Sequence, residues 1–366
     1  MGQPRYFPGY GEDWEARKPA EVGVNADALQ AAVDFAMAHE YSGSRDLRQA
    51  ILEGFSHEPY HKLLGPTKER GGPAGMIIKD GYLLASWGDT KRVDMTFSVT
   101  KSYLSTVAGL AVDDGLIRSV DDEAAEYVWD GTFEGSHNSQ ITWDHLLTQS
   151  SDWSGTFLGL HDWADRPPRE GDVDTWRNRE LVTPGTVMEY NDVRVNVLAY
   201  SLLQVWRKPL PEVLKTRVLD PIGASTTWRW FGYDHAWVTM DGHQVQTVTG
   251  GGHSGAGLFI STVDHARFGY LFLNQGKWRN RQLLSSEWVA AVQVPSAAHG
   301  SYGYMWWLNQ GPRKWEQVDD ESIYYAAGFG GNFIIVDESR DLLMVTRWLE
   351  PREVGEFVAK VLAAME

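Results

Sequence analysis

The stretch MTFSVTKSYLSTVAGLAVDDGL, residues 95–116, decides how the rest of the chain is interpreted. Its apolar residues recur at the spacing of a helix, which predicts one continuous helix over 97–114 that ends at Gly115. Near its start, Ser98 and Lys101 stand three residues apart, so they would share one face of the helix. Free backbone N–H groups in a first helical turn would stabilise negative charge on the serine. The pair is therefore a candidate nucleophile with an amine beside it.

Ser98 needs a base to become a nucleophile. A lysine with the usual pKa of about 10.4 is protonated at neutral pH and cannot accept the serine proton. Burial among apolar neighbours disfavours the ammonium and is expected to lower the pKa of Lys101. The alternative is a solvated helix start whose Ser98 and Lys101 side chains never meet, and spacing alone does not decide between the two.

A third candidate side chain is Tyr190, in the segment MEYNDVRVN. It stands immediately before a predicted helix that Asn191 or Asp192 can cap, which places the phenol at the mouth of a loop. A tyrosine near an ammonium can act as a general acid or base. A tyrosine that merely packs at the end of the loop is the alternative.

Composition excludes several classes of function. The 366-residue chain has a formal net charge of −16 and no cluster of Lys and Arg, so no nucleic-acid partner is expected. It has no cysteine, which excludes thiol nucleophiles, thiolate metal sites and disulfides. The start MGQPRYFPGYGEDWEARKPAE lacks a signal-peptide pattern and no segment is apolar enough to span a bilayer, so a cytoplasmic location without a membrane partner is expected. The sequence does not indicate an oligomeric state.

Strand and helix signals alternate in blocks along the chain. A helix capped by Asn25, with Leu29, Ala32, Val33 and Ala36 as its apolar stripe, is expected first. A hairpin should turn at Asp80-Gly81, because that dipeptide supplies positive φ angles. A second hairpin is expected to turn at 338–340, and Pro351 should open a last helix.

These blocks predict one catalytic domain over residues 1–366. Its sheet-containing lobe would comprise 1–95 and 250–366, and its mostly helical lobe 96–249. The fold class is α/β in the α+β sense, with a central antiparallel sheet flanked by helices. The 17 tryptophans are concentrated in a few segments. Any single tryptophan is expected to pack in the core, whereas the clusters together indicate a cleft with aromatic walls.

Two short motifs match by accident. HEPYH, residues 57–61, fits the H-E-x-x-H zinc pattern, but Pro59 would break the helix that the pattern requires, so a surface loop is expected. GGGHSG, residues 250–255, fits G-x-G-x-x-G without a βαβ unit around it, which favours a turn. The neighbours His253 and Ser254 within it are poorly placed to form a catalytic pair, and no G-x-S-x-G nucleophile elbow occurs.

Together these features resemble the serine hydrolases of the class C β-lactamase and penicillin-binding-protein superfamily. That group includes esterases, D-aminopeptidases and the 6-aminohexanoate-dimer (nylon-oligomer) hydrolases. FSVTKSYLSTVAGLAVDDGLI is similar to the family's Ser-x-x-Lys helix, YND stands where the family has Tyr-x-Asn, and TGGGHSGAGLFISTVDHARFGYLFLNQGKW is similar to its Gly-rich segment and following helix. The resemblance covers nearly the whole chain, and it implies a β-lactamase/transpeptidase-like fold.

The resemblance also implies roles for particular residues. Ser98 would be acylated, while Lys101 and Tyr190 would relay its proton to the leaving group. The backbone N–H groups of Ser98 and Phe329 would form the oxyanion hole. No metal and no cofactor are implied.

The chain departs from the family pattern at two places. The third residue of the Tyr motif is Asp192 rather than Asn, and the strand motif Lys-Thr-Gly is replaced by Ala326-Ala327-Gly328. By position, Asp192, Ala327 and Gly328 would be the substrate-binding residues. Penicillin-recognising members use the strand lysine to grip a substrate carboxylate, whereas the nylon-oligomer hydrolases and related esterases also lack it, which makes those branches the nearer relatives.

The expected function is therefore hydrolysis of a small ester or amide through an acyl-serine intermediate. The alternative within the same class is a β-lactamase or D-amino-acid peptidase. An alternative of another class is an inactive binding module that keeps the scaffold.

Overall fold

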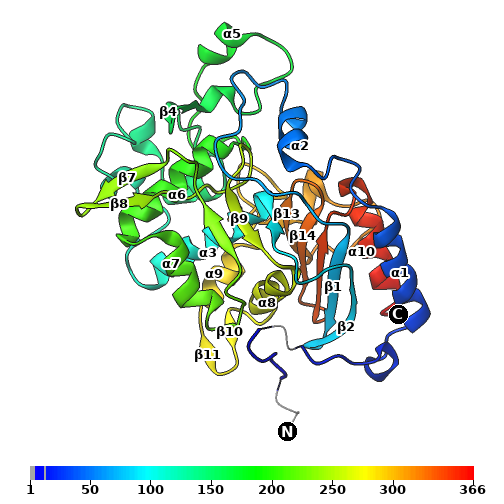
Figure 1. Cartoon of the computed structure of the whole chain (residues 1–366). Helices are drawn as coiled ribbons and strands as arrows, with labels where there is room; N and C mark the ends of the chain where they lie inside the picture. The colour runs from blue at the N-terminus through cyan, green and yellow to red at the C-terminus, as the bar shows by residue number, and fades with distance from the viewer. Residues whose placement is uncertain (1–4, 12–13) are drawn as a thin grey trace.

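The computed structural model describes residues 5–11 and 14–366. At its centre lies a six-stranded sheet with the order β12-β13-β14-β15-β1-β2, in which every neighbouring pair is antiparallel (Figure 1). The strands are β1 (Ala74–Lys79), β2 (Tyr82–Trp87), β12 (Trp307–Leu308), β13 (Tyr324–Gly328), β14 (Asn332–Asp337) and β15 (Leu342–Arg347). The predicted α+β class with a central antiparallel sheet is confirmed.

Two hairpins of this sheet turn where the sequence predicts. Asp80 and Gly81 join β1 to β2 with φ angles of 53° and 87°. Those positive angles match the right-handed twist of the paired strands. The second hairpin joins β14 to β15 across residues 338–341.

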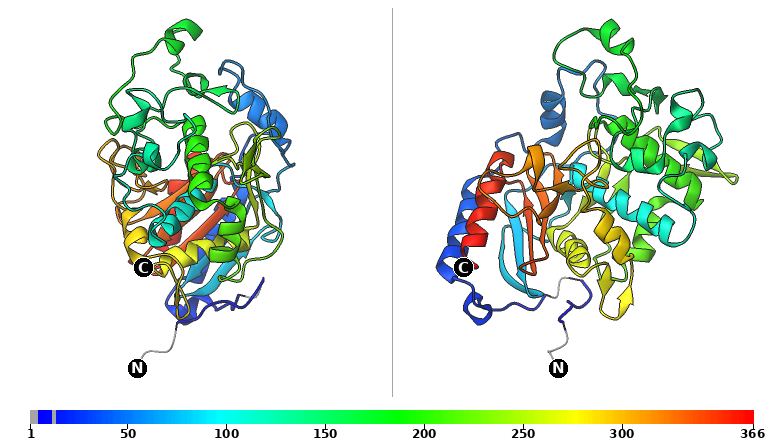
Figure 2. Two further views of the ribbon diagram at one scale, coloured as in Figure 1. Left: turned by 90° about the vertical axis from the view of Figure 1, so that its left-hand side faces the viewer. Right: turned by 180° about the vertical axis from the view of Figure 1, so that it is seen from behind.

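Helices cover both faces of the sheet. α1 (Ala26–Ala38) and α10 (Val354–Ala363) lie side by side on one face, as Figure 2 shows at the blue and red ends of the chain. Asn25 caps α1, whose buried residues are the predicted Leu29, Ala32, Val33 and Ala36. A 3₁₀ turn, Pro351–Glu353, leads into α10. The predicted first and last helices are thus confirmed.

α8 (Thr262–Leu273) packs on the opposite face of the sheet. Successive residues of β14 and β15 alternate between the two faces, because side chains of a strand point alternately up and down. Ile335 and Met344 belong to the core beneath α1 and α10, whereas Ile334 and Leu343 belong to the core that contains α8.

Beside the sheet lies a region rich in helices and short hairpins. Its elements are α3 (Thr100–Asp113), α4 (Trp143–Leu147), β4 (Thr156–Phe157), β5 (Leu160–His161), α5 (Val173–Arg177), α6 (Asp192–Trp206), α7 (Leu210–Leu214), β7 (Trp237–Met240) and β8 (His243–Gln246). A small sheet with the order β3-β9-β6, formed by Asp94–Met95, Gly257–Ile260 and Arg229–Phe231, joins this region to the rest. The other elements are α2 (Leu47–Gly54), β10 (Lys277–Trp278), β11 (Arg281–Gln282) and α9 (Ser286–Ala291).

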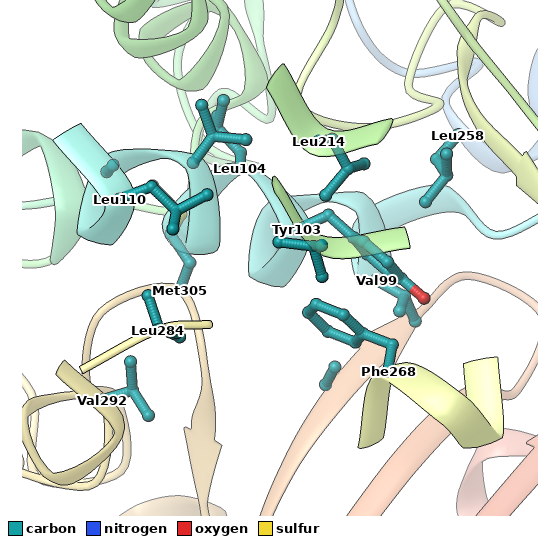
Figure 3. Packing of buried hydrophobic residues seen from close by; sticks show 14 of the residues in the cluster. Val99, Tyr103, Leu104, Leu110, Leu214, Leu258, Phe268, Leu284, Val292 and Met305 are labelled. Atoms are coloured by element: carbon teal, nitrogen blue, oxygen red, sulfur yellow. The ribbon is translucent and has the colours of Figure 1, made fainter. Parts of the chain in front are cut away.

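α3 is buried along nearly its whole length between the helical region and the sheet. Tyr103 on α3 stacks on Phe268 of α8 with ring centroids 3.7 Å apart, and Figure 3 shows both rings in the shared core. The single helix predicted over 97–114 is wrong at its start. Phe97–Val99 form a separate 3₁₀ turn before α3, because Phe97 has a φ of 50° that an α-helix cannot accommodate. Gly115 ends the helix as predicted, with a φ of 70°.

Within the described residues, no helix is both long enough and apolar enough to cross a bilayer.

Candidate active site

Ser98 lies in the 3₁₀ turn between β3 and α3, in the wall of a cavity of about 360 Å³. Lys101, in the first turn of α3, donates a hydrogen bond from Nζ to Ser98 Oγ at 3.0 Å. The lysine is only 1% exposed, so the alternative of a solvated pair that never meets is wrong. The sharp turn at Phe97 holds Ser98 at the cavity, and the Phe97 ring is fixed against the rings of Phe329 and Trp348.

Lys101 is also ion-paired. Its Nζ donates to Asp192 Oδ1 at 2.6 Å. Burial of the ammonium is the largest single influence and opposes its charge, but Asp192 and Tyr190 together more than offset it, and the pKa of Lys101 is raised. The expectation of a lowered pKa is therefore wrong: burial acts in that direction, but no local pattern indicates the buried counter-ion ninety-one residues away.

Asp192 is itself buried, at 3% exposure, at the start of α6. Its second oxygen, Oδ2, lies 2.7 Å from the guanidinium of Arg166. Burial opposes ionisation of this carboxyl, but the Lys101 ammonium and the Arg166 guanidinium hold its pKa well below the usual range. Asp192 does not line the cavity, so in this structure it contacts Lys101 rather than the space open to a substrate.

Tyr190 reaches the cavity from the loop before α6. Asn191 caps that helix by accepting a hydrogen bond from the N–H of Arg194 at 3.1 Å. It is one of the two residues predicted as the cap. The Tyr190 ring centroid lies 4.7 Å from Lys101 Nζ. The ring stacks on Trp307 with centroids 5.8 Å apart.

The end of β13 forms the opposite side of the cavity. Ala327, Gly328 and Phe329 line it together with Ser98. A Cβ at Gly328 would lie 2.3 Å from the carbonyl oxygen of Thr96 and 3.3 Å from the backbone nitrogen of Ser98. The strand backbone therefore passes directly beside the amide of Ser98. This closeness places the predicted oxyanion-hole residues, Ser98 and Phe329, around one space.

Five aromatic rings give the cavity wall its apolar character. The lining residues are Phe55, Phe97, Ser98, Arg166, Tyr190, Gly252, His253, Trp307, Arg313, Ala327, Gly328 and Phe329. Trp307 is the one tryptophan in this lining, and phenylalanines supply most of the remaining rings. The expected aromatic-walled cleft is present, but tryptophans contribute to it less than their number suggested.

A family model described as Beta-lactamase matches residues 67–348. The chain belongs to the beta-lactamase family. This membership confirms the family resemblance inferred from the motifs. A comparison with curated protein sequences found no match.

Several solved structures share the fold of this chain at low identity. A beta-lactamase from Mycobacterium bovis has a TM-score of 0.57 and 20% identity, over 86% of this chain and 99% of that one. EstCE1, a hydrolase with promiscuous acyltransferase activity, has a TM-score of 0.57 and 15% identity, over 93% and 99%. A candidate 6-aminohexanoate-dimer hydrolase from Bacillus anthracis has a TM-score of 0.55 and 15% identity, over 99% and 87%.

The beta-lactamase-family site also contains cations that the sequence did not reveal. Arg166 and Arg313 both line the cavity, although the strand motif itself carries no cation. Arg166 is neutralised by Asp165 and Asp192. Arg313 lies over the ring of Trp307 at 4.4 Å and has no carboxylate partner among the described residues. Nothing in the local sequence of either arginine marks it as part of the site.

The two short motifs that match by accident, HEPYH and GGGHSG, lie next to each other beside this site. HEPYH forms turns after α2, not a helix, but Glu58 is 7% exposed, so the expectation of a surface loop is wrong for this residue. Glu58, His61 and His253 place ligand atoms within 4.8 Å of one another, as do Asp165, Asp192 and His253. Either set could hold a metal ion by residue type. The GGGHSG segment is the predicted turn, and it brings His253 into the cavity wall.

Proposed function

We propose that the chain is a serine hydrolase that cleaves a small ester or amide through an acyl-serine intermediate. The observation that carries this proposal is the 3.0 Å contact between Lys101 Nζ and Ser98 Oγ in the wall of the cavity. Membership of the beta-lactamase family supports hydrolysis as the reaction class. The substrate class and the roles of individual residues are part of the proposal.

In the proposed acylation step, Ser98 Oγ attacks the substrate carbonyl as the amine form of Lys101 takes its proton. Tyr190, with its ring 4.7 Å from the same Nζ, passes a proton to the leaving group. The N–H groups of Ser98 and Phe329 hold the developing oxyanion. In deacylation, Tyr190 takes a proton from the attacking water, and Ser98 Oγ takes back the proton held by Lys101 as its bond to the acyl carbon breaks.

An ester or small amide fits the strand that faces Ser98. Ala326 and Ala327 supply no charge, and Ala326 is 1% exposed. The substrate is then held mainly by apolar contact with the surrounding rings. Two proteins of similar fold, EstCE1 and the candidate 6-aminohexanoate-dimer hydrolase, are hydrolases of this general kind by their names.

A β-lactam or D-peptide substrate is the second candidate, and Arg313 is the observation that favours it. Its guanidinium borders the cavity without a carboxylate partner among the described side chains. A substrate carboxylate could pair with it there.

The test is labelling with a fluorophosphonate probe, followed by hydrolysis of p-nitrophenyl acetate. Ser98→Ala should lose labelling and at least about 10³-fold in kcat/KM, because no other group can form the acyl bond. Hydrolysis and labelling by Ser98→Ala at the wild-type level would contradict the mechanism.

A substrate panel separates the candidates. It should contain p-nitrophenyl esters of rising chain length, a linear amide dimer and a chromogenic cephalosporin. Faster turnover of the cephalosporin than of the esters would favour the second candidate. If intact-mass measurement detected no acyl-enzyme with any of these compounds, the chain would be an inactive binding module.

A further inference from the structure

Gln149 lies in the turn that follows α4, with its backbone in the left-handed conformation. Its φ is 54°, and the residue is 1% exposed. Glycine and asparagine adopt this conformation more readily than a residue with a long side chain. Such a backbone persists where the surrounding contacts fix it, and it is frequent near functional sites. The contacts of Gln149 therefore indicate why a glutamine occupies this position.

Gln149 binds the chain on both sides of Tyr190. Its backbone carbonyl accepts a hydrogen bond from the N–H of Glu189 at 2.9 Å. Its side-chain Oε1 accepts a second from the N–H of Asn191 at 3.0 Å, in a buried position. A single residue thus holds the backbone immediately before and immediately after the tyrosine.

The side-chain amide of Gln149 also reaches the aromatic wall of the cavity. Because its oxygen faces the N–H of Asn191, its nitrogen faces the other way, and Nε2 donates to the hydroxyl of Tyr302 at 2.8 Å. The Tyr302 ring packs edge-on against Trp307 with centroids 4.6 Å apart, and Trp307 stacks on Tyr190. A glycine would suit the backbone of residue 149 but would supply neither side-chain bond.

The phenol of Tyr190 depends on this support. Among the described residues its hydroxyl makes no hydrogen bond, so its position is set by the ring contacts and by the backbone that carries it. A general acid must come within hydrogen-bond reach of the atom that it protonates. A displacement of about 1 Å can cost roughly 10²-fold in rate.

We propose that Gln149 is a positioning residue for Tyr190, which holds the backbone on both sides of the tyrosine so that the phenol reaches the leaving group. This role rests on the proposed function, because it presupposes that Tyr190 passes a proton to the leaving group. Asn191 lies forty-two positions beyond Gln149 in the chain, so no local pattern links the two residues.

The measurable consequence depends on the leaving group. A p-nitrophenolate can leave an ester without a proton, whereas an alkoxide must be protonated as it leaves. Displacement of Tyr190 therefore slows acylation by an ethyl ester more than acylation by a p-nitrophenyl ester of the same acid. A general loss of folded structure lowers both rates by the same factor. The ratio kcat/KM covers the steps up to release of the leaving group and so excludes deacylation.

The experiment compares kcat/KM for the ethyl and p-nitrophenyl esters of one acid in wild type and Q149M. Methionine keeps the length of the side chain and removes the amide. We expect Q149M to lose roughly 10²-fold on the ethyl ester and no more than about threefold on the p-nitrophenyl ester. Y302F removes only the partner of Nε2 and should show a smaller difference in the same direction. Circular dichroism establishes folding, and Y302F carries the comparison if Q149M does not fold.

Gln246 on β8 is the matched control. Its Oε1 accepts a hydrogen bond from the N–H of Gly232 at 3.2 Å, and its Nε2 donates to the carbonyl oxygen of Tyr233 at 3.0 Å. Gln246 does not line the cavity. Q246M therefore removes an amide with the same kinds of partner and should change both esters by the same factor.

Two further measurements separate positioning from a merely structural role. Adding Q149M to Y190F should leave the ratio of the two kcat/KM values unchanged, because the phenol is already gone. Hydrogen exchange at the Asn191 amide is independent of catalysis. Q149M should accelerate that exchange by roughly tenfold, whereas Q246M should not.

Three results would overturn the proposal. One is a Q149M variant that loses nothing, or loses equally on both esters. Another is the same change of ratio with and without the Tyr190 hydroxyl. The third is an Asn191 amide that exchanges as slowly in Q149M as in wild type. Failure of the proposed function is a separate outcome, in which Ser98→Ala keeps its labelling by fluorophosphonate.

Discussion

At the scale of single residues, a carboxylate at position 192 in place of an asparagine amide changes the electrostatics of the site. An Asn at position 192 would leave Lys101 without a counter-ion, whereas Asp192 pairs with it at 2.6 Å. The pKa of Lys101 is consequently raised although burial opposes this. Sequence reasoning considered burial alone and obtained the opposite sign. The identity of residue 192 was known, but its distance from Lys101 was not.

Tyr190→Phe tests the phenol at the same scale. The substitution keeps the ring that stacks on Trp307 and lies near Lys101, and removes only the hydroxyl. We expect kcat to fall by roughly 10²- to 10⁴-fold, as for loss of a general acid or base. The melting temperature should change less than it would on truncation of a buried side chain. A variant with wild-type kcat would remove Tyr190 from the mechanism.

At the scale of elements, the position of Ser98 depends on the turn between β3 and α3 rather than on the helix α3 itself. The 3₁₀ turn Phe97–Val99 replaces the first helical turn that periodicity predicted. Its positive φ at Phe97 carries a cost of about 1–3 kcal/mol and persists because Phe329 and Trp348 enclose the ring. Periodicity reports which side chains are buried, but not where the backbone changes from one helical form to another.

Gly328→Ala tests the contact between β13 and this turn. The new Cβ would clash with the carbonyl oxygen of Thr96, which is backbone and cannot swing away. We expect a roughly 10²-fold loss of kcat through displacement of the oxyanion donors, with a stability loss of about 1–3 kcal/mol.

Gly300→Ala is the matched control, because a Cβ there meets no atom within 4 Å. Steady-state kinetics and thermal denaturation measure the two effects. Equal kcat in Gly328→Ala and wild type would show that the strand does not contribute to the site.

At the scale of the whole molecule, one buried neutral histidine, His265, connects the helical region to the sheet side. His265 on α8 bonds Thr96 Oγ1 at 2.6 Å and Tyr103 Oη at 2.8 Å. Burial and the charge of Arg347 lower the pKa of His265 well below its usual value. In the unfolded chain the same imidazole binds a proton below a pH of about 6.5.

Acid should therefore destabilise the protein. Below pH of about 6.5 the unfolded state binds more protons than the folded state, so the free energy of unfolding falls as pH falls. His265→Asn should show a smaller decrease in melting temperature between pH 7 and pH 5 than wild type. The exposed His243→Asn variant is the control and should follow wild type. An unchanged slope in His265→Asn would contradict this account.

Much of the fold was predictable because local rules decide it. The Asp80-Gly81 turn, the Asn25 cap and the apolar stripe of α1 each depend on neighbours in sequence, and all three are confirmed. The spacing of Ser98 and Lys101 made them a candidate pair but left a solvated pair open, and their contact is seen only in the structure.

The sequence by itself determined the two hairpins, the first and last helices, and Ser98 and Lys101 as a candidate pair. Only the tertiary structure decided what surrounds that pair. Glu58, Arg166, Asp192 and His253 come from four separate segments, and no local pattern links them. Electrostatic effects depend on distances between charges and on their burial, and those quantities exist only once the chain has folded.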